Sequence, residues 1–193
     1  MIILETPRLI IRNWEDRDRE LMHEINSDDD VMRFFPFRRN RAESDDLFER
    51  LQKMITETGF GFYALEEKLS GQCIGFAGLA CTDLEPHFPK GTVEIGWRLA
   101  HRFWGKGYVT EAGNALLAYA FETLNLPEVV SFAVFNNDRS TSVMQRIGMA
   151  RDETGDFDHP NVPDETPHLK HHVVYRLANY TKNRITFRAT PPK

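Results

Sequence analysis

Cysteine and long apolar runs are scarce in this sequence of 193 residues. The two cysteines, Cys73 and Cys81, have no metal-binding or redox spacing, so we expect buried free thiols in a reducing compartment. The longest apolar run beyond the N-terminus, ALLAYAF, is too short to cross a bilayer. Charged residues interrupt the start, MIILETPRLIIRNW, which fits neither a signal peptide nor a membrane span. We therefore expect a soluble cytoplasmic protein without a membrane partner.

A surplus of positive charge is also missing. The formal net charge is −5, which argues against a nucleic-acid partner, because polyphosphate binders usually carry a basic surplus. Hydrophobic residues make up 41% of the chain, enough for a sizeable core. The length suggests a single domain, which we place at residues 1–180. Residues 181–193 end in two prolines and have few apolar anchors, which predicts a flexible tail.

Hydrophobic periodicity predicts an alternating order of strands and helices. Strands are expected at residues 8–14, 59–67, 73–81, 93–100, 128–135 and 171–177. Helices are expected at residues 15–26, 43–55, 110–124 and 139–147. In this order a meander of antiparallel strands precedes a strand–helix–strand crossover, whose two strands must run parallel. The sequence therefore predicts a mixed α/β fold.

The stretch HRFWGKGYVTEA joins the fourth strand to the third helix. Backbone N–H groups at a helix start have no partners, and Gly105 and Gly107 have no Cβ atom to hold an anion away from them. Lys106, with Arg102 nearby, adds positive charge. The glycine loop (residues 104–109) therefore predicts a pyrophosphate cradle; the alternative is a tight strand-to-helix turn. It is neither a Walker loop nor a GxGxxG fingerprint, which would place glycine at Thr110.

The segments VEIGWRLA, WGKGYVTEA and NNDRSTSVMQRIGM together resemble the GNAT superfamily of acyl-CoA-dependent N-acyltransferases. TPRLIIRNWEDRD and HHVVYRL look like its branch of ribosomal-protein acetyltransferases, RimJ and RimL, so the resemblance runs from Thr6 to Leu177. It implies a GNAT-type α/β fold whose mixed sheet of about six to seven strands is splayed between the two parallel strands flanking the main helix. It also implies an N-acetyltransferase with acetyl-CoA as co-substrate and no metal.

The same resemblance implies how acetyl-CoA is bound. The superfamily motif Q/R-x-x-G-x-G/A matches literally from Arg102, whereas spacing favours a start at Trp104, with departures at Trp104 and Val109. The amides expected to hold the pyrophosphate are those of Gly105, Lys106, Gly107, Tyr108 and Val109. Main-chain contacts to pantetheine are expected at Trp97, Arg98 and Leu99, and the Leu99 N–H is the candidate oxyanion donor.

Candidate catalytic groups follow from the needs of acetyl transfer to an amine. By resemblance Glu94 is the general base, and a carboxylate in a partly buried cleft has a raised pKa. The alternative is an ion-paired or structural glutamate. Glu111 competes for the same role but suits the first turn of a helix. Asn137 is expected on the pantetheine arm and Ser140 near the sulfur, unless Ser140 caps the helix.

The general acid stays open at this stage. Many GNAT enzymes carry a tyrosine where this chain has Met144, which leaves Ser140, Tyr175 or water. The expected mechanism is direct attack by a primary amine, of a small molecule or a protein N-terminus, in a ternary complex of a monomer or homodimer. The rival hypotheses are a non-catalytic acyl-CoA-binding module and, more distantly, a kinase or ATPase.

Two further groups of residues allow alternative interpretations. His171 and His172 point to opposite faces of a strand, so we expect no metal at the four histidines His159, His168, His171 and His172. Residues 156–168 are expected to form a loop beside the acceptor pocket, where Asp156, Asp158 and His159 either bind an ammonium group or are solvated. The aromatic side chains of the loop after the first helix either line the acceptor cleft or anchor the core: Phe34, Phe35 and Phe37.

Overall fold

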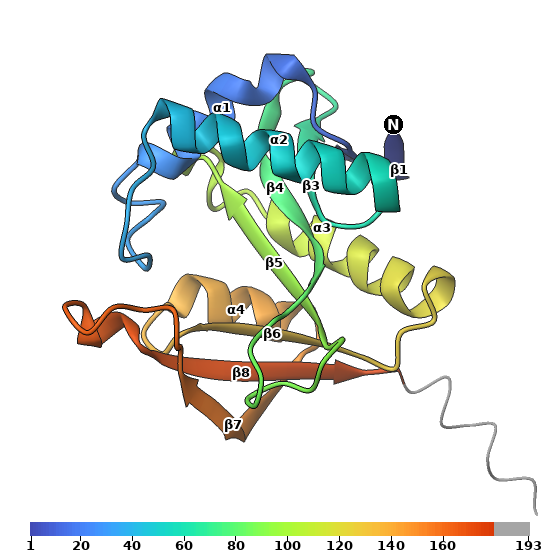
Figure 1. The fold of residues 1–193 in the computed structure, drawn as a ribbon. Helices are drawn as coiled ribbons and strands as arrows, with labels where there is room; N and C mark the ends of the chain where they lie inside the picture. The colour runs from blue at the N-terminus through green and yellow to red at the C-terminus, as the bar shows by residue number, and fades with distance from the viewer. Residues whose placement is uncertain (180–193) are drawn as a thin grey trace, which may run out of the picture.

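The computed structural model describes residues 1–179 as one mixed eight-stranded sheet, in the order β1-β2-β3-β4-β5-β6-β8-β7 (Figure 1). The strands are β1 Ile2–Glu5, β2 Leu9–Arg12, β3 Phe62–Glu67, β4 Cys73–Cys81, β5 Val93–Leu99, β6 Glu128–Val134, β7 Ala150–Asp158 and β8 His171–Ala178. Neighbouring strands are antiparallel except β5 and β6, which run parallel as the crossover requires. The expected tail, residues 181–193, lies outside the described residues.

The expectation of six to seven strands is corrected to eight. Ile2–Glu5 pairs with β2, although the sequence analysis assigned no structure to these four residues. The strand β7, ARDETGDFD, carries five charged residues and no alternation of apolar side chains, so its sequence has no strand signal. Pairing with β8 at the edge of the sheet makes it a strand. Asp156 and Asp158 therefore lie on β7, and the predicted loop begins after them.

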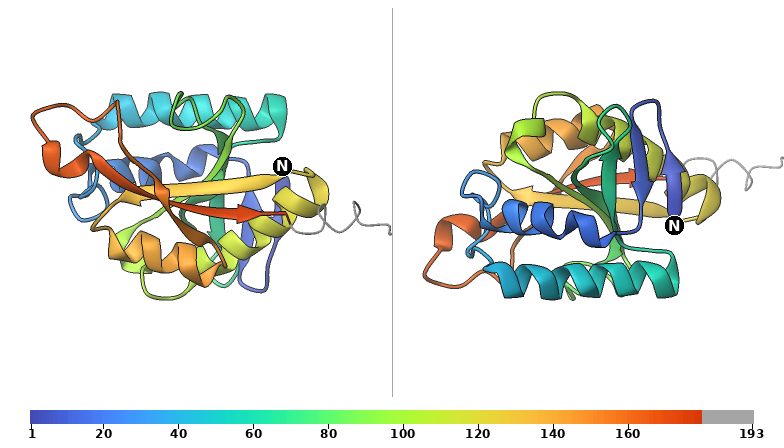
Figure 2. Two further views of the ribbon diagram at one scale, coloured as in Figure 1. Left: turned by 90° about the horizontal axis from the view of Figure 1, so that it is seen from below. Right: turned by 90° about the horizontal axis from the view of Figure 1, so that it is seen from above.

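Helices cover both faces of the sheet (Figure 2). α1 Arg19–Ser27 and α2 Arg41–Thr58 lie on one face, and α3 Tyr108–Ala118 and α4 Asp138–Arg146 lie on the other. Short 3-10 turns occur at Asp16–Asp18, His101–Phe103 and Pro167–Leu169. The expected helix at 110–124 begins instead at Tyr108, directly after the glycine loop, and passes into a π-helical turn at Tyr119–Thr123.

The core forms where apolar faces of α1, α2 and α3 meet the sheet. Trp14 shows why the N-terminal segment belongs to it, because its ring contacts Phe48 of α2 and Phe76 of β4 edge-on. The Trp14 Nε1 donates to the Phe62 carbonyl at 2.9 Å, so burying the indole leaves no unsatisfied donor. No helix within residues 1–179 is long and apolar enough to span a membrane.

One expectation about buried side chains is wrong, and one of two open alternatives is excluded. Cys73 and Cys81 are free, but Cys81 is exposed, because it is the last residue of β4, where the strand leaves the sheet. The three aromatic side chains after α1 are not core anchors: Phe34 and Phe35 are half-buried, and Phe37 is 42% exposed. The loop holds them at the surface beside β5 instead.

Candidate active site

The strands β5 and β6 pair over a very short length. Their ladder is limited to Glu94 opposite Val130, and the Ser131 hydroxyl adds a hydrogen bond of 2.9 Å to the Ile95 carbonyl. β6 continues alongside β8 as far as Val134, and β5 continues alongside β4 as far as Leu99. The carboxyl ends of β5 and β6 are thus not bonded to each other. The facing main-chain groups there are available to the amides of a ligand.

The glycine loop lies at the end of this gap. Gly105 and Gly107 have φ angles of 74° and 79°, in the left-handed region that favours glycine. Gly107 caps α3 without a side-chain hydrogen bond. None of the backbone N–H groups of residues 105–110 donates to an acceptor within residues 1–179. Six amides without an acceptor at the positive end of a helix are typical of an anion cradle, so the local geometry fits a diphosphate.

The N-terminal segment braces the cradle through Glu111. This carboxylate accepts hydrogen bonds from the Thr6 hydroxyl at 2.6 Å, from the Arg8 backbone N–H at 2.8 Å and from Arg8 Nε at 2.6 Å. Arg8 Nη1 also donates to the Lys106 carbonyl at 2.9 Å. Burial by itself would raise the pKa of Glu111, but these hydrogen bonds outweigh burial and hold the pKa below its usual value. The Glu111 carboxylate is therefore occupied by these structural hydrogen bonds. The sequence analysis did not identify Thr6 and Arg8 as its partners, because no spacing in the sequence indicates this contact.

Glu94 lies on the opposite face of β5 from the buried Val93 and Ile95. We call this side of the strand, which carries Glu94, Gly96 and Arg98, the Glu94 face; Asn26 of α1 contacts it at Arg98. The Glu94 carboxylate has no hydrogen-bond or ion-pair partner within residues 1–179, so the ion-paired alternative finds no counter-ion. Burial raises the pKa of Glu94 to about 7. Such a carboxylate can accept a proton near neutral pH.

The start of α4 lies across the gap from β5. Asn137 caps this helix by accepting the Ser140 backbone N–H at 3.3 Å, so the cap is Asn137 and not Ser140. Ser140 is half-buried, and Met144 is buried in the core. The buried Tyr175 hydroxyl accepts a hydrogen bond of 3.3 Å from Gln145 Nε2. Ser140 and Tyr175 thus both remain near α4 as sources of a proton.

The other predicted cofactor residues lie around the same gap. Trp104 Nε1 donates to the Leu99 carbonyl at 2.9 Å, and the Arg139 guanidinium lies 4.5 Å from the Trp104 ring centroid. Trp104 therefore connects the end of β5 to α4 across the gap. Arg102 is drawn away from the cradle, because its guanidinium pairs with Glu24 of α1. Tyr108 places its hydroxyl against Glu67. Trp97 and Leu99 pack into the core.

Histidines from β8 and two loops gather in an aromatic cluster that the sequence did not predict. The ring centroids of His159 and His172 are 5.0 Å apart, and that of Phe157 lies 4.8 Å from His87. Burial lowers the pKa of His159 to about 4, so this imidazole is neutral at pH 7. Across residues 1–179, no three His, Cys, Asp or Glu side chains are arranged to hold a metal ion.

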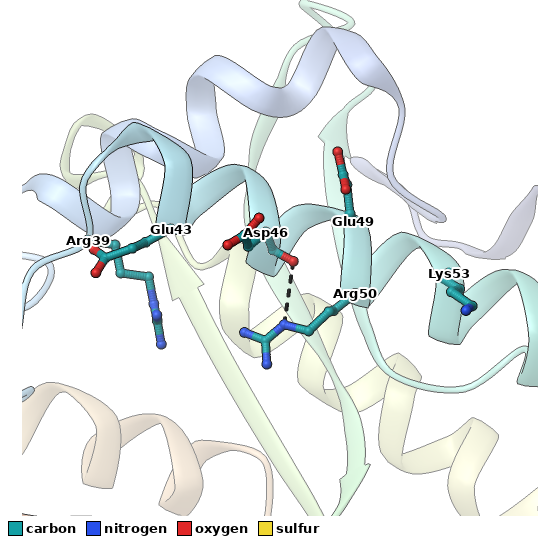
Figure 3. A pocket seen from close by; sticks show the side chains of 6 residues that line it. All are labelled: Arg39, Glu43, Asp46, Glu49, Arg50 and Lys53. Carbon is teal, nitrogen blue, oxygen red and sulfur yellow. Dashed lines mark hydrogen bonds between the residues drawn. The ribbon is translucent and has the colours of Figure 1, made fainter.

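The two aspartates predicted beside the acceptor have partners within the protein. Asp156 pairs with Arg151, and Asp158 lies 3.3 Å from His171 Nδ1. A separate groove of about 500 Å³ runs along α2 (Figure 3). Both its arginines, Arg39 and Arg50, point away from α1. The groove is lined by charged side chains of both signs: Arg39, Glu43, Asp46, Glu49, Arg50 and Lys53.

Comparison with known proteins gives consistent matches. The family model described as "Acetyltransferase (GNAT) domain" matches residues 8–150, which include Glu94, the glycine loop and α4. The uncharacterized N-acetyltransferase YnaD of Bacillus subtilis is 30% identical over 150 residues, covering 77% of this chain and 83% of YnaD. FsC-acetyl coenzyme A-N(2)-transacetylase of Aspergillus fumigatus is 30% identical over 155 residues, covering 78% of this chain and 66% of that protein. A GNAT-family acetyltransferase structure from Bacillus anthracis, 25% identical, has a TM-score of 0.75 over 93% of this chain and 99% of that one.

Proposed function

The chain belongs to the GNAT acetyltransferase family, and on that premise we propose that it transfers the acetyl group of acetyl-CoA to a primary amine in a ternary complex. The acceptor amine belongs to a small molecule or a protein N-terminus, and the domain comprises residues 1–180. The observation that carries the catalytic part of the proposal is Glu94, a carboxylate without a counter-ion within residues 1–179, whose pKa is raised to about 7. It lies where the pairing of β5 with β6 ends.

The residues of the gap would hold acetyl-CoA in the following way. The amides of residues 105–110 bind its diphosphate, with Lys106 adding charge. Main-chain groups of Trp97, Arg98 and Leu99 meet the amides of pantetheine, and Asn137 supports the arm from α4. The left-handed glycines and the uncommitted amides of the loop support this placement, because an anion needs exactly such bare backbone.

In the transfer itself, acetyl-CoA supplies an activated acetyl thioester. Glu94 takes a proton from the acceptor ammonium, directly or through water, which leaves the amine lone pair free to attack. The Leu99 N–H stabilises the negative charge that develops on the carbonyl oxygen. As the C–S bond breaks, the nitrogen of the tetrahedral intermediate loses its remaining extra proton to solvent. Ser140, Tyr175 or water gives a proton to the leaving sulfur, a modest requirement because a free thiol has a pKa of about 8.5.

Thiol release tests the proposed function. Purified protein, acetyl-CoA and a panel of primary amines should release free coenzyme A thiol, detected with a thiol reagent and matched to the acetylated amine by mass spectrometry. Protein without an acceptor should release thiol at the background rate. Binding of acetyl-CoA without turnover on any amine would favour the non-catalytic module instead.

Gly107→Ala should weaken acetyl-CoA binding by roughly tenfold, because alanine disfavours the left-handed φ of 79° in the glycine loop and its Cβ would lie 3.5 Å from Arg8 Nη2, which braces that loop. Calorimetric titration of acetyl-CoA measures the effect. Gly91→Ala is the matched control: its φ of 85° imposes similar backbone strain, and open space surrounds the new Cβ. Gly91 lies in the loop before β5, so this control should lose stability but keep its affinity. Equal affinities of the two variants would contradict the cradle.

A further inference from the structure

Arg98 is a half-buried cation without a counter-ion within residues 1–179. Its guanidinium lies between the rings of Phe35 and Phe76, 4.2 and 5.3 Å from their centroids. Its one hydrogen bond within residues 1–179 runs from Nη1 to Asn26 Oδ1, at 2.8 Å. Burial, and secondly the nearby charge of Arg39, lower the pKa of Arg98 to about 10. The side chain is therefore still charged at neutral pH and lacks a compensating anion.

The unused edge of this guanidinium is open to a ligand. Within residues 1–179, the buried side-chain nitrogen and oxygen atoms without partners are His23 Nδ1 and Asp45 Oδ1. Neither belongs to Arg98, so its Nε and Nη2, which have no acceptor within residues 1–179, are not completely sealed from solvent. These two nitrogens present parallel N–H groups in a rigid plane. Such an edge matches the two oxygens of a carboxylate, which accept both bonds at once.

Asn26 also contacts a second arginine, Arg39, whose charge acts on Arg98 and whose guanidinium lies 4.7 Å from the Phe37 ring centroid. Its side-chain oxygen accepts Arg98, and its backbone carbonyl accepts the Arg39 backbone N–H at 2.9 Å. Asn26 is fully buried and rigidly placed on α1. Arg39 also has no carboxylate partner within residues 1–179, whereas Arg41, two residues further on, pairs with Glu20 at 2.6 Å. Two neighbouring cations without an acid favour binding of an anion from outside.

We propose that Arg98 and Arg39 bind a carboxylate of the acceptor, so that the substrate is an amino acid or another amine that carries an acidic group. The inference rests on the proposed function, because the amine must reach Glu94. Arg98 and Glu94 lie on the same face of β5, four residues apart, which is about 13 Å along a strand. The Glu94 face thus offers a base for the amine and a cationic fork for the acid.

Matched acceptors test the inference. Each amino carboxylate is compared with its carboxamide, which keeps the amine but removes the negative charge, and an aminoalkyl phosphonate distinguishes carboxylate from phosphate-like anions. The wild type should acetylate the carboxylates with kcat/KM at least tenfold above the carboxamides. Arg98→Met should abolish this preference, mainly through KM. Arg98→Lys keeps the charge but lacks the fork, and should recover only part of it. Preference for the phosphonate over the carboxylate would overturn the assignment of the anion.

Arg146→Met is the control, since it removes one positive charge from the exposed end of α4 and should keep the preference. Equal kcat/KM for carboxylates and carboxamides, or a preference that survives Arg98→Met, would overturn the inference while leaving acetyl transfer intact. Failure to acetylate any acceptor would instead contradict the proposed function. In that case calorimetry with an amino carboxylate and coenzyme A-loaded protein decides the inference: heat lost in Arg98→Met supports it, and absence of heat in the wild type overturns it.

Discussion

Glu94→Gln should lower kcat by a factor of about 10² to 10⁴, the usual contribution of a positioned general base. The wild-type rate should also depend on pH in a defined direction. Because the pKa of Glu94 is raised to about 7, the carboxylate is increasingly protonated below that pH, and kcat/KM should fall about tenfold per pH unit. Above pH 7 this dependence should level off. Thiol-release rates between pH 5.5 and 9 measure both effects. In the Glu94→Gln variant, the change in kcat/KM near pH 7 should be absent.

Glu122→Gln makes the same chemical change at an exposed position after α3 and should leave the rate and its pH profile unaltered. A Glu94→Gln protein with full activity across this range would show that another group, or water alone, removes the proton.

Glu94→Gln should lower activity but raise the free energy of unfolding at alkaline pH. A glutamate whose pKa is raised from 4.5 to about 7 in the folded protein costs stability as pH rises through that window, because the folded state resists ionisation. Glu94→Gln should therefore be more stable than the wild type at pH 8, on the order of 1 to 3 kcal/mol, and similar to it at pH 4. Urea unfolding at both pH values separates this effect from a loss of folding.

Asp18→Ala should lower the free energy of unfolding by about 3 to 5 kcal/mol, the effect of removing one partner from a buried ion pair. Arg12 is 3% exposed and Asp18 is 2% exposed. Arg12 Nη1 and Nη2 donate to the two Asp18 oxygens at 2.7 and 3.0 Å, and Arg12 Nε donates to Glu66 at 2.8 Å. Without Asp18, the guanidinium stays buried and keeps Glu66 at 2.8 Å and the more distant Glu15 at 3.8 Å as its carboxylate partners. Urea unfolding monitored by circular dichroism measures the loss.

Asp16→Ala is the matched control two residues away, because the Asp16 side chain is 83% exposed and pairs with Arg19 only at the surface. It should cost less than about 1 kcal/mol. Replacing both buried partners, as in Arg12→Met with Asp18→Leu, should recover much of the loss, because no charge then remains buried. A loss below 1 kcal/mol for Asp18→Ala would show that the pair is solvated and contributes little.

Local signals in the sequence predicted much of the fold. The alternation in VEIGWRLA and the period of DLFERLQKMI identified β5 and α2, because each pattern buries one face of a regular element. The charged β7 had no such signal, and its strand conformation depends on hydrogen bonds from β8. The sequence left open whether the aromatic side chains after α1 belong to the core, because hydrophobicity alone does not distinguish a core residue from one that packs on a cation, as Phe35 does on Arg98.

The sequence by itself determined the glycine loop and the alternation that places Glu94 on the face opposite Val93 and Ile95, since both depend on neighbouring residues along the chain. Only the tertiary structure decided which groups meet across long separations. It brought Arg8 to Glu111, Asn26 to Arg98 and Asp18 to Arg12. It also left Glu94 without a counter-ion in the described chain. Such contacts form only when the strands and helices pack together, so the pattern of residue types along the chain cannot predict them.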